Sequence, residues 1–430
     1  MTTPKYMRGL LPLSADPITK GHVHLVKKAL QIAQEIIVFV GNNDSKRGKY
    51  LFDINQRTRM VRQSLDLAGL EHVRIVAGDA LLVGVYIREA CDVVIRGVRN
   101  AEDRRYEETQ MGLHSLIHNV DVEFIEADEG YTQVSSTMVK AFTDHSVDTS
   151  PYVDIHVKRK LEVAIKQQWL VGVTGGIATG KSWVTDALVK RCIERGIPAT
   201  AIKVDDLQRQ IYASPTPSGV ALREAFGDLF GPEILTEDQK DVNRKHLMAL
   251  LSDPSFSESS RKVLHHLIKP LVLQAIREAR NGTFWGTHPY RYGLDPDSVH
   301  GITIAERHPI GGLVFIEWAQ MAEMGLSHWV NHNVIVVDTT PETREKFLQQ
   351  RGIDPETFQG LQKLQWSAED KALAITEAAG QDGWGDVLLY VNDPEENLID
   401  ELIEGVREML PDVDEWPKHK RWEFLPRRSF

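Results

Sequence analysis

The sequence predicts an α/β protein of two domains, each built on a parallel sheet with helices on both faces. Strand-like and helix-like segments alternate from the start to about residue 142, and a second alternation runs from Trp169 to about Leu410. Such alternation is typical of parallel sheets. The length of 430 residues fits two or three domains. We place the domains at 1–167 and 168–430, because a new apolar strand begins at this point.

In the first domain, five apolar segments are expected to form strands, at residues 6–13, 35–41, 72–77, 93–96 and 122–126. Helical patterns lie between them. One helix is expected to begin at Asp53, because Asp53 and Gln56 have the spacing of a capping box. The stretch "VDIHVKRKLEVAIKQQ" predicts a charged amphipathic helix that closes this domain.

Two features interrupt the second alternation. Residues 206–280 are rich in helical patterns and contain no clear strand. Residues 281–312 form an insertion with many Gly, Pro and aromatic residues and no periodicity. Loops of this length are usually functional or disordered, and the aromatic residues favour an ordered loop. The insertion contains His288, His300 and His308, for which scattered surface histidines are a far commoner explanation than a metal site.

The composition is that of a globular protein, with 26% charged and 42% hydrophobic residues. A formal net charge of −11 argues against a nucleic-acid partner. The two cysteines lack metal-ligand spacing. No apolar run reaches the roughly 20 residues that a membrane span needs, and no signal peptide is evident. We therefore expect a cytoplasmic protein without a membrane partner, and the sequence leaves open a homo-oligomer.

The stretch "GGIATGKS" matches the phosphate-binding pattern G-x-x-x-x-G-K-[ST]. It follows the apolar run "WLVGVT" and precedes a helical pattern, which is the context that a P-loop requires. Lys181 is expected to pair with phosphate oxygens, and Ser182 to bind Mg²⁺ that accompanies ATP. The residues expected to surround the phosphates with backbone N–H groups are Gly175, Gly176, Ile177, Ala178, Thr179 and Gly180.

Asp205 and Asp206 follow the next apolar segment, "ATAIK". A carboxylate at the tip of a strand beside the P-loop can approach both Mg²⁺ and an acceptor hydroxyl, so Asp205 is a candidate metal ligand and general base. The alternative is a cap for the following helix, and the two roles can coexist.

The stretches "VTGGIATGKS", "VDDLQRQ", "VNRKHLMALLSDPS", "LIKPLV", "AEMGL" and "VIVVDTTPET" resemble, in this order, the dephospho-CoA kinases. That resemblance implies a helical acceptor-binding region, a lid, and transfer of phosphate from Mg-ATP to the ribose 3′-hydroxyl of dephospho-CoA. It makes Asp205 the base, places Arg244 on the acceptor side and Arg351 in the lid over the ATP phosphates, and puts Asn392 near the adenine.

This half departs from the family in three places. Lys203 stands at the first Asp of an Asp-Ala-Asp motif, Lys269 replaces the His of a His-Pro pair, and "AQM" replaces Pro-Leu-Leu. We assign Lys269 to the residues that bind the substrate. The three departures are expected to affect the affinity of this half for its acceptor, dephospho-CoA.

Polar residues gather where strands of the first domain end. Ser14 and Asp16 end the first strand, and Thr19, Gly21 and His22 open the helix that follows. Ligands of open α/β sheets bind at this edge, and a His at a helix start can stabilise charge on a phosphate. Further candidates follow the other strands: Lys46, Arg96, Arg99, Glu107, Ser135, Ser136 and Thr137. Taken one at a time, each has an ordinary alternative as a surface or capping residue.

The stretches "DPITKGH", "IRGVR", "YE" and "SSTMVK" resemble the phosphopantetheine adenylyltransferases over residues 5 to about 166. That resemblance implies a Rossmann-like nucleotidyltransferase domain that transfers AMP from ATP to 4′-phosphopantetheine. His22 and Ser14 would bind the triphosphate, and Lys46 and Arg96 the reacting phosphates. The ATP-binding set would also include Thr19, Gly21, Arg99, Glu107, Ser135, Ser136 and Thr137. The stretch "LSAD" departs from the family's Gly-Thr-Phe-Asp, and the Leu13 side chain is expected to narrow the phosphate cradle.

Two halves in this order resemble the bifunctional coenzyme A synthases, in which the product of the first reaction is the substrate of the second. Two alternatives remain open at this point. One is a nicotinamide-mononucleotide adenylyltransferase fused to a ribosylnicotinamide kinase. The other is a chain in which one half has become a nucleotide-binding regulatory or scaffold module.

Overall fold

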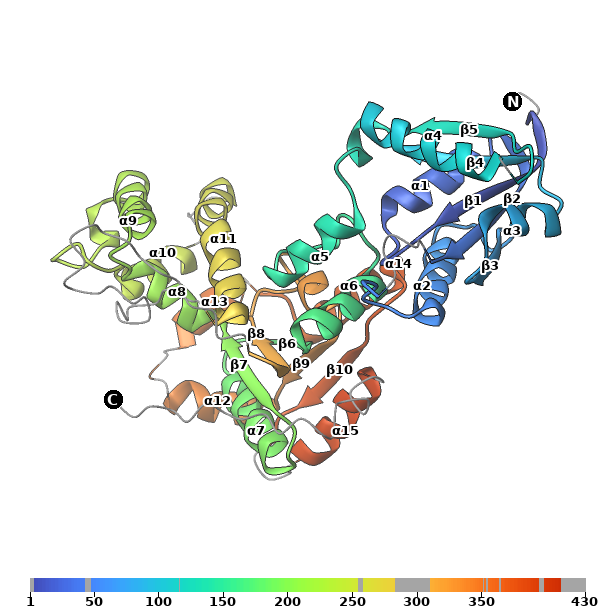
Figure 1. The fold of residues 1–430 in the computed structure, drawn as a ribbon. Coiled ribbons are helices and arrows are strands. Elements are labelled where there is room, and N and C mark those ends of the chain that lie inside the picture. The colour runs from blue at the N-terminus through green and yellow to red at the C-terminus, as the bar shows by residue number, and fades with distance from the viewer. Residues whose placement is uncertain are drawn as a thin grey trace, which may run out of the picture.

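Two parallel five-stranded sheets form the framework of the molecule (Figure 1). The computed structural model describes residues 4–42, 48–115, 117–253, 258–282, 310–350, 352, 355–362, 365–393 and 398–410. Most of the insertion, residues 283–309, lies outside this part, as do the three insertion histidines. The predicted α/β class with parallel sheets is confirmed.

The first sheet has the order β3-β2-β1-β4-β5, and each neighbouring pair is parallel. Its strands are β1 (Tyr6–Leu13), β2 (Ala33–Gly41), β3 (Arg74–Gly78), β4 (Val93–Val98) and β5 (Val122–Glu126). The helices that follow these strands are α1 (Lys20–Ala29), α2 (Ile54–Leu67), α3 (Leu82–Arg88), α4 (Ala101–Ser115) and α5 (Ser136–Asp144). The capping box of Asp53 and Gln56 is present at the start of α2, as predicted. Leu10 and Leu11 pack on opposite faces of the sheet, so both faces are buried.

The second sheet has the order β10-β9-β6-β8-β7 and is also parallel. Its strands are β6 (Gln168–Gly175), β7 (Ala199–Lys203), β8 (Gly312–Glu317), β9 (Val334–Asp338) and β10 (Val387–Val391). Every residue of β6 is buried. The expectation that the strand "ATAIK" lies beside the P-loop strand is wrong, because β8 is inserted between β6 and β7.

Helices of the second half cover both faces of this sheet and extend beyond its β7 edge as a helical lobe of α8–α11 (Figure 1). The helices are α7 (Lys181–Glu194), α8 (Val204–Tyr212), α9 (Pro217–Phe230), α10 (Arg244–Ser252), α11 (Glu258–Asn281), α12 (Pro341–Gln350), α13 (Pro355–Gln362), α14 (Ala368–Asp382) and α15 (Ile399–Met409). The helix-rich character expected for residues 206–280 is therefore seen where these residues are described.

The two halves meet along α6 (Ile155–Leu161) and the π-helical segment η3 (Glu162–Lys166). This is the stretch expected to be a charged amphipathic helix, yet Lys158, Arg159 and Glu162 are each less than 5% exposed. Their charged groups face the second half rather than solvent. The guanidinium of Arg159, for example, lies 4.5 Å from the ring centroid of Trp384.

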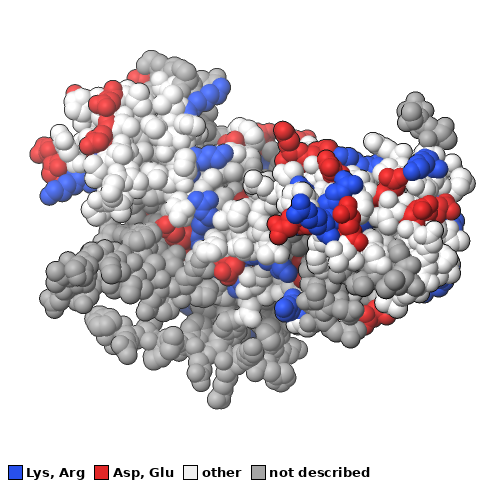
Figure 2. Space-filling view, turned by 45° about the horizontal axis from the view of Figure 1, so that its top comes forward, with Lys and Arg blue, Asp and Glu red and all other residues white. Residues whose placement is uncertain are grey.

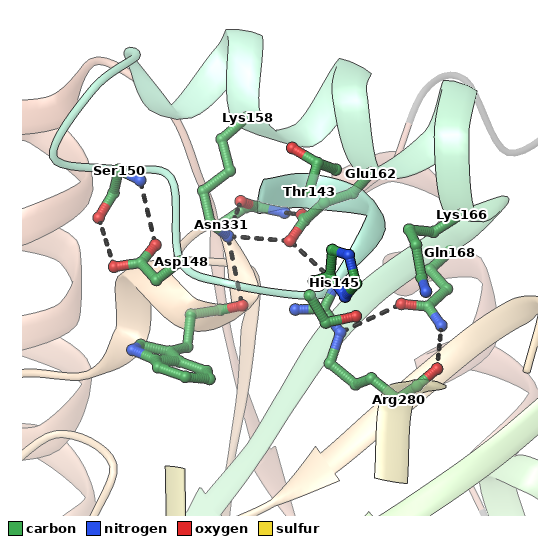
Figure 3. A network of polar contacts seen from close by, with 12 residues as sticks. Thr143, His145, Asp148, Ser150, Lys158, Glu162, Lys166, Gln168, Arg280 and Asn331 are labelled. Carbon is green, nitrogen blue, oxygen red and sulfur yellow. Dashed lines mark hydrogen bonds and ion pairs between the residues drawn. The ribbon is translucent and has the colours of Figure 1, made fainter. Parts of the chain in front are cut away.

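Glu162 is the centre of the polar network at this boundary (Figure 3). Its Oε1 accepts a hydrogen bond from Arg280 Nη2 at 3.0 Å and another from Lys158 Nζ at 3.2 Å. Its Oε2 accepts from Asn331 Nδ2 at 2.7 Å. Lys158 Nζ also donates to Asn331 Oδ1 at 2.8 Å. The carboxylate therefore ties η3 to α11 and to the segment before β9.

A second set of contacts extends the boundary around Asn281 at the end of α11. Its Oδ1 accepts from Lys166 Nζ at 2.5 Å and from Ser146 Oγ at 2.9 Å. Its Nδ2 donates to the His145 carbonyl at 3.1 Å. The helix that ends the helical lobe is thus bonded directly to the first half.

Charges of both signs are interspersed on one face of the molecule. On the face shown in Figure 2, Lys and Arg side chains of the described residues lie interspersed with Asp and Glu. Within the described ranges, no helix has the length and apolar character that crossing a membrane requires.

Replacing Glu162 by Ala is expected to lower the free energy of unfolding by about 3–5 kcal/mol, because Lys158 and Arg280 would keep buried, uncompensated charges. Differential scanning calorimetry of the full chain measures this loss. The matched control is Glu194→Ala, since Glu194 forms ion pairs on an exposed helix face and should change stability by less than about 1 kcal/mol. Equal effects of the two substitutions would contradict a central role for Glu162.

Candidate active sites

Asp16 organises the first candidate site, at the carboxyl end of β1. Its carboxylate accepts hydrogen bonds from the backbone N–H groups of Leu51 and Phe52, both at 3.0 Å. It also pairs with Lys140 Nζ of α5 at 2.9 Å. Asp16 is 6% exposed. One buried carboxylate thus joins the turn after β1 to the segment that precedes α2 and also to helix α5.

The start of α1 presents His22 in a fixed orientation. Thr19 caps the helix, and its backbone N–H donates to His22 Nδ1 at 3.0 Å. Because Nδ1 accepts this bond, the proton of the neutral ring lies on Nε2, where it can be donated to a phosphate oxygen. A Cβ at Gly21 would meet only ordinary contacts of 3.6 Å or more. The protein's own packing therefore does not require this glycine, whereas close approach of a ligand would.

The start of α5 lies against the same turn. Ser135 caps the helix by accepting from the Met138 N–H at 3.1 Å. Ser136 Oγ donates to the Pro17 carbonyl at 2.8 Å, and Thr137 is exposed in the first turn. The structure thus brings the predicted residues of α1 and α5 together beside Asp16.

The predicted residues of β4 and α4 pair with each other. Arg96 Nε lies 3.2 Å from Glu107 Oε2, without the alignment of a hydrogen bond. Burial lowers the pKa of Arg96, and the charge of Glu107 opposes that shift. Arg99 pairs instead with Asp103 on the exposed side of α4. In this structure Glu107 is thus the counter-ion of Arg96. Lys46 lies outside the described residues.

Two side chains near this site differ from what the sequence indicated. Leu13 packs in the hydrophobic core, so its bulk does not narrow the phosphate cradle as expected. Arg57, which the sequence interpretation missed, is 1% exposed and lies behind the site. Its Nη1 donates to the carbonyls of Ser14 at 2.6 Å and Gly41 at 3.0 Å, and its Nη2 donates to Asn42 Oδ1 at 2.6 Å. It therefore fixes the ends of β1 and β2.

Replacing Arg57 by Ala should lower stability by roughly 2–4 kcal/mol, because three hydrogen bonds disappear and buried carbonyls lose their donors. Urea unfolding of the full chain tests this. Arg59→Ala is the control, since Arg59 is exposed on the same helix. Arg57→Lys should recover little, because an ammonium lacks the planar fork that reaches two strands. Full recovery by Lys would contradict this assignment.

The second candidate site is the loop between β6 and α7. Gly175 has φ +149°, and a Cβ there would lie 2.1 Å from the Val337 carbonyl oxygen. Gly180 has φ +80°, and a Cβ there would lie 2.2 Å from Asn392 Nδ2. Both glycines are therefore required by the backbone path, which brings the loop to the N-terminus of α7 as a P-loop does.

The side chains that follow this loop are those of a nucleotide site. Lys181 Nζ donates to the Gly176 carbonyl at 2.6 Å, so it already reaches back over the loop. Ser182 Oγ donates to Glu317 Oε1 at 2.7 Å. Glu317 ends β8, the neighbour of β6, and the sequence interpretation missed it. The apolar run "LVFIE" that ends in an acid could have indicated it.

Asp205 and Asp206 were expected at the tip of a strand. They lie instead in the first turn of α8. Burial raises the pKa of Glu317, and the charge of Asp205 adds to this, whereas Ser182, Lys181 and Lys203 act in the opposite direction. Asp205 is thus close enough to influence the carboxylate at the P-loop. Asp206 pairs with Arg209 at the surface.

Asn392 supports the P-loop from behind. It is 1% exposed, and its Nδ2 donates to the Thr179 carbonyl at 3.0 Å. Thr339 Oγ1 donates to the Asn392 carbonyl at 2.7 Å. The structure therefore places Asn392 against the phosphate loop, whereas the family resemblance implied a position near the adenine. Arg351 lies outside the described residues.

The two predicted acceptor residues lie on the helical lobe. Arg244 is the first residue of α10 and is exposed. Lys269 is half-buried on α11. Desolvation lowers the pKa of His265 on the same helix, and the charge of Lys269 lowers it further. They are thus on separate helices of the lobe.

Replacing Asn392 by Ala should reduce phosphate transfer by the second half about 10- to 100-fold, since a displacement of ~1 Å in a catalytic loop can cost that much. The loss should be the same with ATP and GTP, because the side chain supports the loop and not the base. Kinetics with both nucleotides measure it. Tyr390→Phe is the control, since it removes a buried hydroxyl that has no partner among the described residues. A loss confined to ATP would favour the adenine role.

The fold and the two sites define a nucleotidyltransferase joined to a P-loop kinase. Residues 14–142 match the family model for cytidylyltransferase-like proteins, and residues 169–283 match the model for dephospho-CoA kinase. The phosphopantetheine adenylyltransferase of Petrotoga mobilis is 34% identical over 152 residues, which cover 35% of this chain and 91% of the relative. That of Thermotoga neapolitana is 34% identical over 163 residues, which cover 37% of this chain and 98% of the relative. The chain belongs to the phosphopantetheine adenylyltransferase family through its first half and carries a dephospho-CoA kinase domain in its second.

One solved structure, TT1252 from Thermus thermophilus, is similar over 57% of this chain and 99% of its own length. Its sequence identity is 21% and its TM-score is 0.37.

Proposed function

We propose that this chain catalyses the last two steps of coenzyme A biosynthesis. The first half transfers AMP from ATP to 4′-phosphopantetheine and releases pyrophosphate. The second half phosphorylates the ribose 3′-hydroxyl of the dephospho-CoA so formed. The observation that carries the proposal is that one polypeptide spans nearly the whole length of its adenylyltransferase relatives and then continues into a dephospho-CoA kinase domain.

In the first reaction, a phosphate oxygen of 4′-phosphopantetheine attacks the α-phosphorus of ATP while the bond to pyrophosphate breaks. The orientation of His22 supports a role for its Nε2–H in stabilising charge on the α-phosphate. Ser14 and Thr19 lie at the same turn, and Arg96, with Lys46, would bind the reacting phosphates. Arg99, Glu107 and the residues 135–137 complete the proposed ATP site.

In the second reaction, the acceptor 3′-oxygen attacks the γ-phosphorus, ADP leaves, and the hydroxyl proton passes to Asp205. Lys181 and the P-loop backbone would hold the phosphates, with Arg351 over them and Asn392 behind them. Arg244 and Lys269 would contact dephospho-CoA. The lobe that carries them lies beside the β7 edge of the sheet.

The residues at the P-loop fit Mg²⁺, which neutralises phosphate charge when it is bound. Ser182 offers a hydroxyl oxygen, Asp205 a carboxylate nearby, and Glu317 Oε2 is buried without a hydrogen-bond partner among the described residues. Oxygen ligands and hydrogen-bond acceptors for bound water are what this cation requires. Ser182 and Asp205 are therefore the proposed metal-binding residues.

The division into domains supports two separable reactions. We place the domain boundary between Gln167, which follows η3 with φ +55°, and Gln168, which begins β6. ATP, 4′-phosphopantetheine and dephospho-CoA are the proposed small-molecule partners, and the proposed compartment is the cytoplasm.

Purified full-length protein with ATP, Mg²⁺ and 4′-phosphopantetheine should form dephospho-CoA and then CoA, resolved by chromatography over time. His22→Ala should slow dephospho-CoA formation by about 10²–10³-fold, the size expected for loss of one group that stabilises charge in the transition state. The same variant should still phosphorylate dephospho-CoA that is added. Lys181→Ala should still form dephospho-CoA but fail to phosphorylate it, so that dephospho-CoA accumulates.

Each variant thus serves as the control for the other, because each keeps the activity that its partner loses. Formation of dephospho-CoA alone by the wild-type protein would show that the second half is inactive. Adenylylation of nicotinamide mononucleotide in place of 4′-phosphopantetheine would overturn the proposal.

A further inference from the structure

The start of α1, which carries His22, is held by a segment that lies between α5 and α6. This segment consists of residues 148–152. The backbone N–H of Lys20 donates to the Tyr152 carbonyl at 2.8 Å, and Lys20 Nζ donates to the Ser150 carbonyl at 2.8 Å. Lys20 is the first residue of α1 and His22 is the third. The segment therefore fixes the turn of α1 that orients His22.

Asp148 holds this segment together. Its Oδ1 accepts a hydrogen bond from the Ser150 backbone N–H at 3.1 Å, and its Oδ2 accepts from the Ser150 hydroxyl at 2.8 Å (Figure 3). The same Oδ2 lies 3.3 Å from Nε2 of His328, a residue of the second half. Burial alone would raise the pKa of Asp148, but the hydrogen bond from His328 and the charge of Lys158 hold this pKa well below its usual range. The carboxylate therefore stays charged and joins the segment to the second half.

His328 is oriented by contacts within the second half. It lies in the short helix η6 (Ser327–Val330), and its Nδ1 donates to the Gly325 carbonyl at 3.1 Å. With Nδ1 bound in this way, Nε2 faces the first half. The neighbouring His332 pairs with Asp382 at 2.9 Å. The His332 pair thus stays within the second half, whereas the His328 pair crosses to the first.

The crossing contact lies beside a cavity of about 370 Å³ between the two halves. Lys20 and Ser150 line this cavity from the first half, and His328 and His332 line it from the second. Because the cavity separates the halves here, side-chain packing is incomplete on this side of residues 148–152. The position of the segment on this side therefore depends on the polar contact with His328.

We propose that the second half takes part in adenylyl transfer by positioning the start of α1. His328 holds Asp148, and Asp148 fixes residues 148–152. These residues hold Lys20, and with it the turn from which His22 acts on the α-phosphate. His328 and Asp148 are thus positioning residues for the first reaction, although His328 lies in the domain that performs the second. This inference rests on the proposed adenylyltransferase function of the first half.

His328→Ala breaks the contact without changing any residue of the first half. The side chain is 26% exposed, so its loss leaves the hydrophobic core intact. The kcat of dephospho-CoA formation should fall about 10- to 100-fold, because a displacement of ~1 Å in a catalytic group can cost that much. The KM for ATP should stay near the wild-type value, because positioning of His22 acts on the transition state. Steady-state kinetics of the full chain with ATP, Mg²⁺ and 4′-phosphopantetheine measure both constants.

A double-mutant cycle tests whether the two residues act through one contact. Asp148→Asn keeps an oxygen that can accept from Ser150 and removes the charge that binds His328. The double variant should then lose no more activity than the more affected single variant. Asp382→Asn is the matched control, because it weakens the His332 pair at the same boundary, which does not reach the first half. Its kcat for dephospho-CoA formation should equal that of the wild type.

Phosphorylation of added dephospho-CoA by His328→Ala separates positioning from support of the fold. Positioning predicts that this second activity stays near the wild-type rate, whereas an equal fall in both activities would show a structural role and overturn the inference. An unchanged kcat for dephospho-CoA formation would overturn it as well, as would a loss that lies only in the KM for ATP or losses that multiply in the double variant.

In each of these cases the proposed function stands, provided that the wild-type protein forms dephospho-CoA. A wild-type protein that does not adenylylate 4′-phosphopantetheine would overturn the proposed function and this inference together.

Discussion

A single buried carboxylate, that of Glu162, receives donors from three separate segments and holds the two halves in one arrangement. Lys158 is in α6, the helix directly before Glu162 in the chain, Arg280 is near the end of α11, and Asn331 precedes β9. Six residues after Glu162, β6 begins and runs as a fully buried strand to the P-loop. The path from this carboxylate to the P-loop is therefore short, and most of it is a buried strand.

The two sites are built in a similar way, although their folds differ. In each, a loop at the carboxyl end of a strand is held from behind by a buried polar side chain. Arg57 does this after β1 by donating to the Ser14 carbonyl, and Asn392 does it at the P-loop by donating to the Thr179 carbonyl. The groups that face the ligand can then be few, because the shape of the backbone is already determined. Preorganisation of this kind is what lets electrostatic groups act on a transition state.

Features that depend on neighbouring residues could be predicted from the sequence. The P-loop, the strands of the first sheet and the capping box at Asp53 each follow from a short sequence pattern. The family resemblance then indicated the two activities. Glu317 and Arg57 were missed because their partners are distant in the chain, and because sheet order cannot be inferred from strand order. The charged stretch at Lys158 was interpreted as solvated, since nothing local shows that a second domain covers it. The same limit applies to Asn392, whose supporting role follows only from its contact with Thr179.

Gln168 connects the residues on the two sides of the long insertion. Its Nε2 donates to the Arg280 carbonyl at 2.9 Å and to the Ile310 carbonyl at 2.7 Å, so one side chain holds both flanks of residues 283–309. The described residues on the two sides of this segment, Arg280 and Ile310, are therefore bonded to the same side chain. Closing a loop costs free energy that grows only with the logarithm of its length. Evolution could therefore lengthen, shorten or exchange this segment without disturbing either sheet, and a protein engineer could use the same point to graft a new module.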